Sequence, residues 1–137
     1  MRRHRYLAAA LAMTMAVASR AEVTTAAGVE TAIAQAMTDG RPVVLEFTAP
    51  WCAGCRELAQ MLAEPAVRRD LGCAELVVVS LAGAPHDPRN LRITERYRVP
   101  ALPLLAFIDR DGREHEDLRL TGAVSAPRVQ HSLAGVC

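Results

Sequence analysis

The sequence predicts an α/β domain in which a mixed central sheet carries helices on both faces. Three observations lead to this prediction. Almost wholly apolar runs occupy residues 43–48 and 75–81, with helix-patterned residues between them. A third apolar run, residues 104–108, is followed at once by the turn-forming sequence Asp-Arg-Asp-Gly at 109–112. Buried parallel strands are continuously apolar and need helical crossovers, whereas a hairpin adds an antiparallel strand, so the sheet should be mixed.

The first half of the domain should alternate helix and strand. Residues 22–28 are expected to be a short polar leader. Apolar side chains at helical spacing then predict the first helix: Val29, Ile33, Ala36 and Met37. Gly40 suits the position just past its end. After the strand at 43–48, a second helix should begin at Cys52, break at Pro65 and continue as a short piece over 66–71.

The second half should end in a hairpin and a helix. In order, we expect a strand at 75–81, a loop at 82–88, a helix at 89–97, a strand at 104–108, a polar edge strand at 114–120 and a helix from Ser125 to about Leu133. Ser125 suits the N-cap of that last helix. With 137 residues and no internal repeat, the chain is expected to hold one folded domain.

Residues 1–21 have the pattern of a secretory signal peptide, which leaves residues 22–137 as the domain. Three arginines precede an apolar run from Leu7 to Val17, and small residues suited to cleavage follow it. The alternative is an uncleaved anchor, but the run is shorter than the ~20 residues that a spanning helix needs. Export to an oxidising compartment such as a bacterial periplasm would allow disulfides to persist.

The charge of the chain argues against nucleic acid as a partner. Its formal net charge is only +1, and all of its basic residues other than histidine are arginines. Cleavage after Ala21 would leave 12 arginines against 15 acidic residues, a net charge of −3. The exported domain should therefore be mildly acidic.

The main chemical signal is the pair Cys52 and Cys55, placed where a strand leads into a helix. The first turn of a helix carries partial positive charge and unpaired N–H groups, which favour a thiolate there. A second thiol one turn later can attack the mixed disulfide that forms. The alternatives are an inert structural disulfide or half of a zinc site, and zinc would need about four ligands, which the scattered histidines do not supply.

Two further residues are unusual for their positions. Glu46 lies within an apolar strand, and burial of its carboxyl group would raise its pKa, which would suit it to accept a proton from Cys55. An outward-facing strand position remains the alternative. Pro103 opens a core strand although proline cannot donate to a sheet ladder, so a cis bond after Leu102 is expected, with a trans proline as the alternative.

Three stretches of this chain resemble the thioredoxin-like family. They are Phe-Thr-Ala-Pro-Trp-Cys-Ala-Gly-Cys-Arg at 47–56, Val-Pro-Ala-Leu-Pro at 99–103, and the ending made of strand, Asp-Gly hairpin, strand, Gly122 and helix. Together they span about residues 29–134. Within the family the chain is most similar to the C-terminal periplasmic domain of the membrane electron transporter DsbD. The resemblance implies the thioredoxin-like fold for the whole exported domain.

The resemblance also implies roles for individual residues. Cys52 would be the exposed attacking thiol, Cys55 the buried resolving thiol, and Glu46 the buried acid beneath them. Pro103 would be the cis-proline that faces the pair, and the backbone of Leu102 beside it would bind an incoming extended peptide. Trp51 would shield and shape the approach to Cys52.

Some features depart from the family pattern. The buried acid is usually Asp and here is Glu46; thioredoxins have a nearby lysine and this chain has none; and the DsbD-type domain has a further acid where this chain has Ala59. Cys73 and Cys137 lie outside the motif. Because the helices that precede them would lie on one face of the sheet, a structural disulfide between them is one hypothesis, and two free cysteines are the other.

The implied function is a periplasmic thiol:disulfide oxidoreductase that works mainly as a protein-disulfide reductase. Strong oxidants of the family carry histidine just before the second cysteine, where this chain has Gly54. No cofactor or metal is expected beyond the Cys52–Cys55 disulfide. Expected partners are disulfide-bonded exported proteins or apocytochrome c, and a membrane donor of the DsbD type, with the chain itself a monomer. The alternatives are a dithiol oxidase or isomerase, a metal carrier that uses the cysteine pair, and a scaffold whose cysteines stay oxidised.

Overall fold

A computed structural model describes residues 22–137, so the predicted signal peptide lies outside the described residues. Its elements in chain order are β1 (Glu22–Val23), α1 (Ala26–Thr38), β2 (Val43–Thr48), α2 (Ala53–Leu62), α3 (Pro65–Leu71), β3 (Glu75–Ser80), α4 (Pro88–Arg96), β4 (Leu104–Ile108), the 3-10 helix η1 (Glu116–Leu118), β5 (Leu120–Thr121) and α5 (Ala126–Val136). Within this part of the chain, no helix has the length and apolarity required to cross a membrane.

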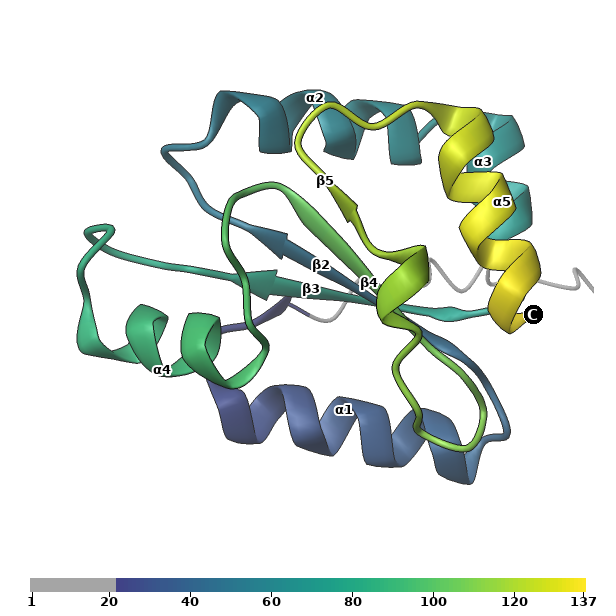
Figure 1. The fold of residues 1–137 in the computed structure, drawn as a ribbon, viewed down its shortest axis with the longest axis horizontal. Helices are drawn as coiled ribbons and strands as arrows, with labels where there is room; N and C mark the ends of the chain where they lie inside the picture. The colour runs from purple at the N-terminus through teal and green to yellow at the C-terminus, as the bar shows by residue number, and fades with distance from the viewer. Residues whose placement is uncertain (1–21) are drawn as a thin grey trace, which may run out of the picture.

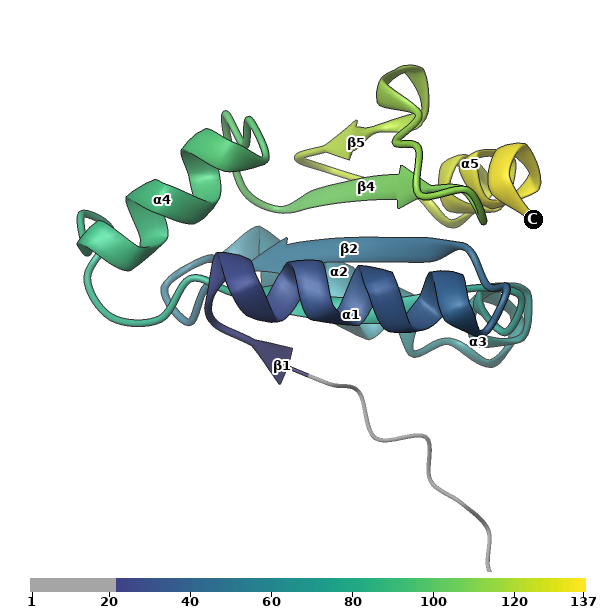
Figure 2. The ribbon, with the colours of Figure 1, turned by 90° about the horizontal axis from the view of Figure 1, so that it is seen from below.

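The sheet is mixed, as the apolar pattern predicts. Its strand order is β1-β3-β2-β4-β5. Strands β1, β3 and β2 run parallel, whereas β4 runs antiparallel to β2 and β5 antiparallel to β4. Helices α2, α3 and α5 cover one face, and α1 and α4 cover the other (Figure 1). The view turned by 90° shows how the helices lie along the strands (Figure 2).

Alternation along β2 divides the core into two clusters. Val43, Leu45 and Phe47 belong to the cluster that includes residues of α1 and α4. Val44 belongs to the opposite cluster, with residues of α2, α3 and α5. Because side chains alternate along a strand, Glu46 must project to the same face as Val44, the face that α2 covers.

The start of the domain differs from the predicted polar leader. Glu22 and Val23 form a short strand that pairs in parallel with Val78 and Val79 of β3. Helix α1 then begins three residues earlier than its first apolar position, because Thr25 caps it by accepting a hydrogen bond from the Gly28 N–H at 3.1 Å. A strand of two residues is too short to show a hydrophobic period.

The predicted edge strand at 114–120 is wrong for most of its length. An isolated bridge joins Glu114 to Ile108, the 3-10 helix η1 follows, and only Leu120 and Thr121 pair with β4. The side chain of Arg119 accounts for the break. Its guanidinium group donates to the backbone carbonyls of Tyr97 and Arg98 and pairs with the carboxylate of Glu114. These contacts hold the chain against the end of α4 instead of along β4. The last helix also extends further than predicted, to Val136.

Candidate active site

The candidate active site begins where β2 leads into α2. Cys52 is the N-cap of α2, and its Sγ accepts a hydrogen bond from the backbone N–H of Cys55 at 3.1 Å. The two cysteines form a disulfide with their Cα atoms 5.3 Å apart. After reduction, a thiolate at Cys52 would sit at the positive end of the helix dipole, next to a donor that already faces it.

The two sulfurs differ in their access to solvent. Cys55 is 2% exposed, whereas Cys52 is only half-buried and the neighbouring Trp51 is 49% exposed. The sulfur of Cys52 can therefore be approached from solvent, whereas Cys55 lies buried behind it. Arg56 is exposed beside the pair, and its guanidinium group donates to the Pro50 carbonyl at 3.3 Å.

A proline loop packs against the cysteine pair. The Leu102–Pro103 peptide bond is cis, and Pro103 is buried. A methyl group added at Gly54 would meet the Cδ of Pro103 at 3.4 Å, so the loop touches the dipeptide between the cysteines. A groove of about 340 Å³ runs beside this contact, and its lining includes Trp51, Cys52, Leu81, Val99 and Leu102. The groove is mostly apolar and ends at the accessible sulfur.

Glu46 is buried in the middle of the sheet and does not face outward. It is 3% exposed, and its register partners on the two neighbouring strands are Val78 and Leu105. Its side chain lies on the α2 face, between two apolar neighbours. Burying a charged carboxylate costs free energy unless the group has a partner.

Two small cavities lie between the sheet and α2. One, of about 240 Å³, is lined by Glu22, Glu46, Thr48, Ala59 and Val78. The other, of about 280 Å³, is lined by Thr48, Ala49, Pro50, Cys55, Arg56, Ala59 and Ser80. Thr48 and Ala59 line both, so the two cavities lie side by side, one at Glu46 and the other at Cys55.

Three residues near these cavities were absent from the sequence predictions. Thr48 could have been found, since it lies two residues after Glu46 and must share its face. Ser80, which is buried, pairs in register with Thr48 on β3, and Glu22 reaches the same region from β1. Neither has a local sequence signal, because both positions depend on the pairing of strands that are distant in the chain.

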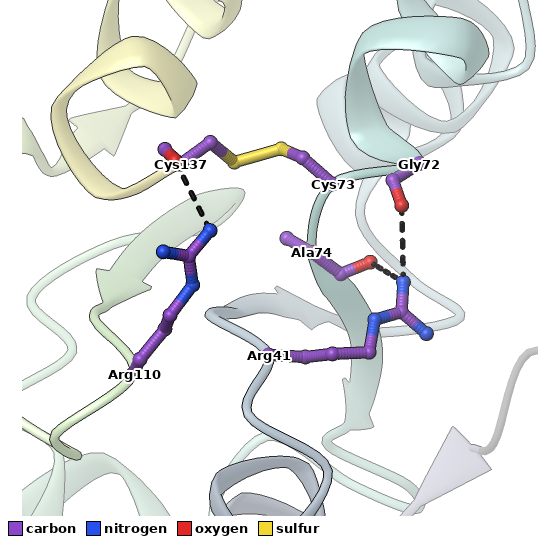
Figure 3. The surroundings of a disulfide bond; sticks show 6 residues. All are labelled: Arg41, Gly72, Cys73, Ala74, Arg110 and Cys137. Carbon is purple, nitrogen blue, oxygen red and sulfur yellow. Dashed lines mark hydrogen bonds between the residues drawn. A yellow bond between two sulfur atoms is a disulfide. The ribbon is translucent and has the colours of Figure 1, made fainter.

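The second cysteine pair is far from the first. Cys73 and Cys137 form a disulfide with Cα atoms 6.0 Å apart (Figure 3). Cys73 precedes the start of β3, which is level with the start of β2, whereas Cys52 follows the end of β2. Since β2 has six residues, about 20 Å of strand separates the two ends.

Arginine side chains surround this second disulfide. Arg110 donates to the carbonyl of Cys137 at 3.2 Å, and Arg41 donates to the carbonyls of Gly72 and Ala74, which flank Cys73 (Figure 3). Both ends of the cross-link are thus held by hydrogen bonds to the backbone. Among residues 22–137, no group of three or more His, Cys, Asp or Glu side chains is arranged to hold a metal ion.

Comparison with known proteins agrees with this geometry. The model of the thioredoxin-like domain family matches residues 29–136. The chain is 29% identical over 119 residues to the thiol:disulfide interchange protein DsbD of Citrobacter koseri and 30% identical over 112 residues to DsbD 1 of Pseudomonas aeruginosa. These matches cover 86% and 81% of this chain but only 20% and 19% of the relatives, so the chain spans about a fifth of their length.

Solved structures show the same fold. The oxidised C-terminal domain of DsbD from Neisseria meningitidis matches with a TM-score of 0.71 at 23% identity, covering 85% of this chain and 100% of that domain. A thioredoxin from Thermus thermophilus matches with a TM-score of 0.63 at 28% identity, covering 86% and 88% of the two chains.

Proposed function

Since this chain belongs to the thioredoxin-like family, we propose that it is an exported thiol:disulfide oxidoreductase that acts mainly as a protein-disulfide reductase. The observation that carries the proposal is the asymmetry of the cysteine pair. Cys52 is accessible at the start of α2, whereas Cys55 is 2% exposed directly behind it. An inert structural disulfide needs no accessible sulfur at a helix N-terminus.

The proposed reaction transfers two electrons in two steps. In the reduced protein, the Cys52 thiolate attacks one sulfur of a client disulfide, and a mixed disulfide forms while the first client thiolate leaves. Cys55 then attacks the Cys52 sulfur, giving up its proton to the carboxylate of Glu46. The second client thiolate leaves, and the protein ends with the Cys52–Cys55 disulfide. The client disulfide gains two electrons, and its two thiolates take protons from solvent.

The groove beside Cys52 is proposed to hold the client. An extended segment around the client disulfide would lie over Trp51 and along the loop at Leu102 and Pro103, where it would pair with the backbone of Leu102. The apolar lining favours clients whose disulfides are flanked by apolar residues. Candidate clients are exported proteins with wrong disulfides and apocytochrome c, whose thiols must be reduced before haem attachment.

Electrons must be resupplied after each turnover. The relatives are named as thiol:disulfide interchange proteins and are about five times as long as the matched region. We therefore propose a membrane electron donor of the DsbD type as the partner that reduces the Cys52–Cys55 disulfide, and the periplasm as the compartment. Cys73 and Cys137 are proposed to be structural, because they lie at the opposite end of the strands.

Trapping of partners tests this function. A Cys55→Ser variant should accumulate mixed disulfides through Cys52, because no second thiol can release the client. Non-reducing gels followed by mass spectrometry would identify both clients and donor. A Cys52→Ser variant is the matched control and should trap nothing. If the wild-type protein reacts with neither dithiothreitol nor oxidised glutathione at the Cys52–Cys55 pair, the proposed function is wrong.

A further inference from the structure

Two glutamates lie in one row across the sheet beneath α2. Glu22 of β1 and Glu46 of β2 are both register partners of Val78 in β3. Residues in register on neighbouring strands project to the same face, so both carboxyl groups stand on the α2 side of the sheet. Two strand spacings separate their backbones, which is about 10 Å.

The two glutamates share one cavity. The cavity of about 240 Å³ is lined by both of them, with Val78, Thr48 and Ala59 completing its wall. Glu22 is exposed, whereas Glu46 is 3% exposed, so the cavity connects a solvent-facing carboxylate with a buried one. The small side chain of Ala59 leaves this space open beneath α2. The lining is mostly apolar, but two carboxyl groups and the hydroxyl of Thr48 offer hydrogen-bond partners for water.

We propose that Glu22 is the outer member of a two-carboxylate proton relay that serves the resolving step through Glu46. This inference rests on the proposed function, because the relay removes the proton that Glu46 accepts when Cys55 attacks. Glu22 touches neither sulfur nor client, so it acts only through Glu46. No sequence motif marks it, because β1 joins the site through its pairing with β3.

The relay gives the proton that Glu46 takes from Cys55 a route to solvent. When Cys55 attacks Cys52, its proton moves to the Glu46 carboxylate, and the S–S bond to the client breaks. The protonated Glu46 is buried and must lose this proton before the next turnover. Water in the shared cavity carries it to the Glu22 carboxylate, which releases it to solvent. No electrons move in this step, and both carboxylates return to their starting state.

The titratable and charged groups around Glu46 come from β1 and α2. Glu22 of β1 lines the cavity of Glu46, whereas Cys55 and Arg56 of α2 line the neighbouring cavity. The register partners on β3 and β4 are Val78 and Leu105, which carry no charge. Glu22 is therefore an acidic residue that shares the cavity of Glu46 and is itself exposed to solvent.

The first test measures the reduction of a client disulfide over successive turnovers, with dithiothreitol as reductant, across a range of pH. Glu22→Gln should leave the first turnover unchanged and slow the later ones by roughly threefold to tenfold, less than the hundredfold or more that loss of a direct general base causes. In a Glu46→Gln background, Glu22→Gln should have no further effect, because both act in one relay. Glu57→Gln is the matched control, since it removes an exposed charge from α2 outside the cavity. Equal rates and pH profiles for wild type and Glu22→Gln would overturn the relay and leave the proposed function intact.

The second test needs no turnover. The carboxyl carbon of Glu46 is followed by NMR during a pH titration of the reduced protein. Removing the negative charge at position 22 should move the midpoint of Glu46 to lower pH by about half a unit, because a like charge disfavours ionisation. Glu57→Gln should leave the midpoint within a fraction of that shift. If the wild type proves inactive, this titration still decides the relay, and an unchanged midpoint in Glu22→Gln would refute it.

Discussion

At the scale of single residues, the side chain at position 54 should set the direction of exchange. Gly54 lies between the cysteines and within contact distance of Pro103, and it offers no charge to a thiolate at Cys52. We expect Gly54→His to make the couple more oxidising, because an imidazolium there would stabilise the reduced, thiolate form. A shift of about 30 mV is expected for each unit by which the pKa of Cys52 falls. Equilibration with glutathione measures the potential.

The control for this substitution is Gly54→Asn, which adds similar bulk without a cationic ring. The space is adequate, since a Cβ at this position would make an ordinary contact with Pro103. Gly54→Asn should change the potential by much less than Gly54→His. If both variants shift it equally, packing against the proline loop sets the potential and charge does not.

At the scale of elements, the turn after β4 depends on one carboxylate. Asp109 accepts hydrogen bonds from the backbone N–H groups of Asp111 and Arg113 and pairs with His115 at 2.8 Å. The hydrogen bond with His115, followed by those from the backbone, holds the pKa of Asp109 below its ordinary value of 3.8. The turn therefore favours the ionised form of this side chain.

The lowered pKa of Asp109 predicts that this turn stabilises the folded protein less in acid than at neutral pH. Since the pKa of Asp109 is lower in the folded chain, its contribution is fully present above pH 3.8 and is lost as pH falls through the folded value. Asp109→Asn should be less stable than wild type at pH 7, and the difference should shrink near pH 3. Urea unfolding at both pH values measures this, with Asp111→Asn as control. A difference that stays constant with pH would contradict the prediction.

At the scale of the whole molecule, the second disulfide ties the C-terminal helix to the sheet. Cys73 follows α3 and Cys137 follows α5, and 64 positions separate them in the sequence. A cross-link that closes so long a loop restricts the unfolded chain. The double variant Cys73→Ser, Cys137→Ser should therefore lose about 2–4 kcal/mol of unfolding free energy. Denaturant unfolding measures the loss.

An activity assay distinguishes the structural role of the Cys73–Cys137 disulfide from a catalytic one. The double variant should reduce client disulfides at the wild-type rate under conditions where it remains folded, because about 20 Å of strand lies between the two cysteine pairs. Intact-mass analysis after alkylation without reductant should show Cys73 and Cys137 linked in the wild type. Free thiols at both positions would remove the basis of the prediction.

The apolar runs predicted the three main strands because β2 and β4 are buried on both faces and β3 is buried or partly buried along its length. The same reasoning missed β1, since two residues have no period, and it extended an edge strand through 114–120 where Arg119 instead holds the chain against Tyr97 and Arg98. The cysteine pair was predicted from its spacing and from its place between an apolar strand and a helix. Ser80 and Glu22 were not, because their place in the site follows from strand register, which couples residues far apart in sequence. Thr48 was also missed, although its position two residues after Glu46 puts it on the same face of the strand.

From the sequence alone, it was clear that a strand delivers two cysteines to the first turn of a helix and that an acid lies within that strand. Both features lie within about ten residues of each other, so the apolar pattern and the spacing of the cysteines are enough to predict them. Tertiary structure alone decided that Glu46 faces α2, that Glu22 joins it across Val78, and that the proline loop touches Gly54. Each of these contacts depends on how distant strands pair and which face a helix covers, and the packing of the whole domain sets both.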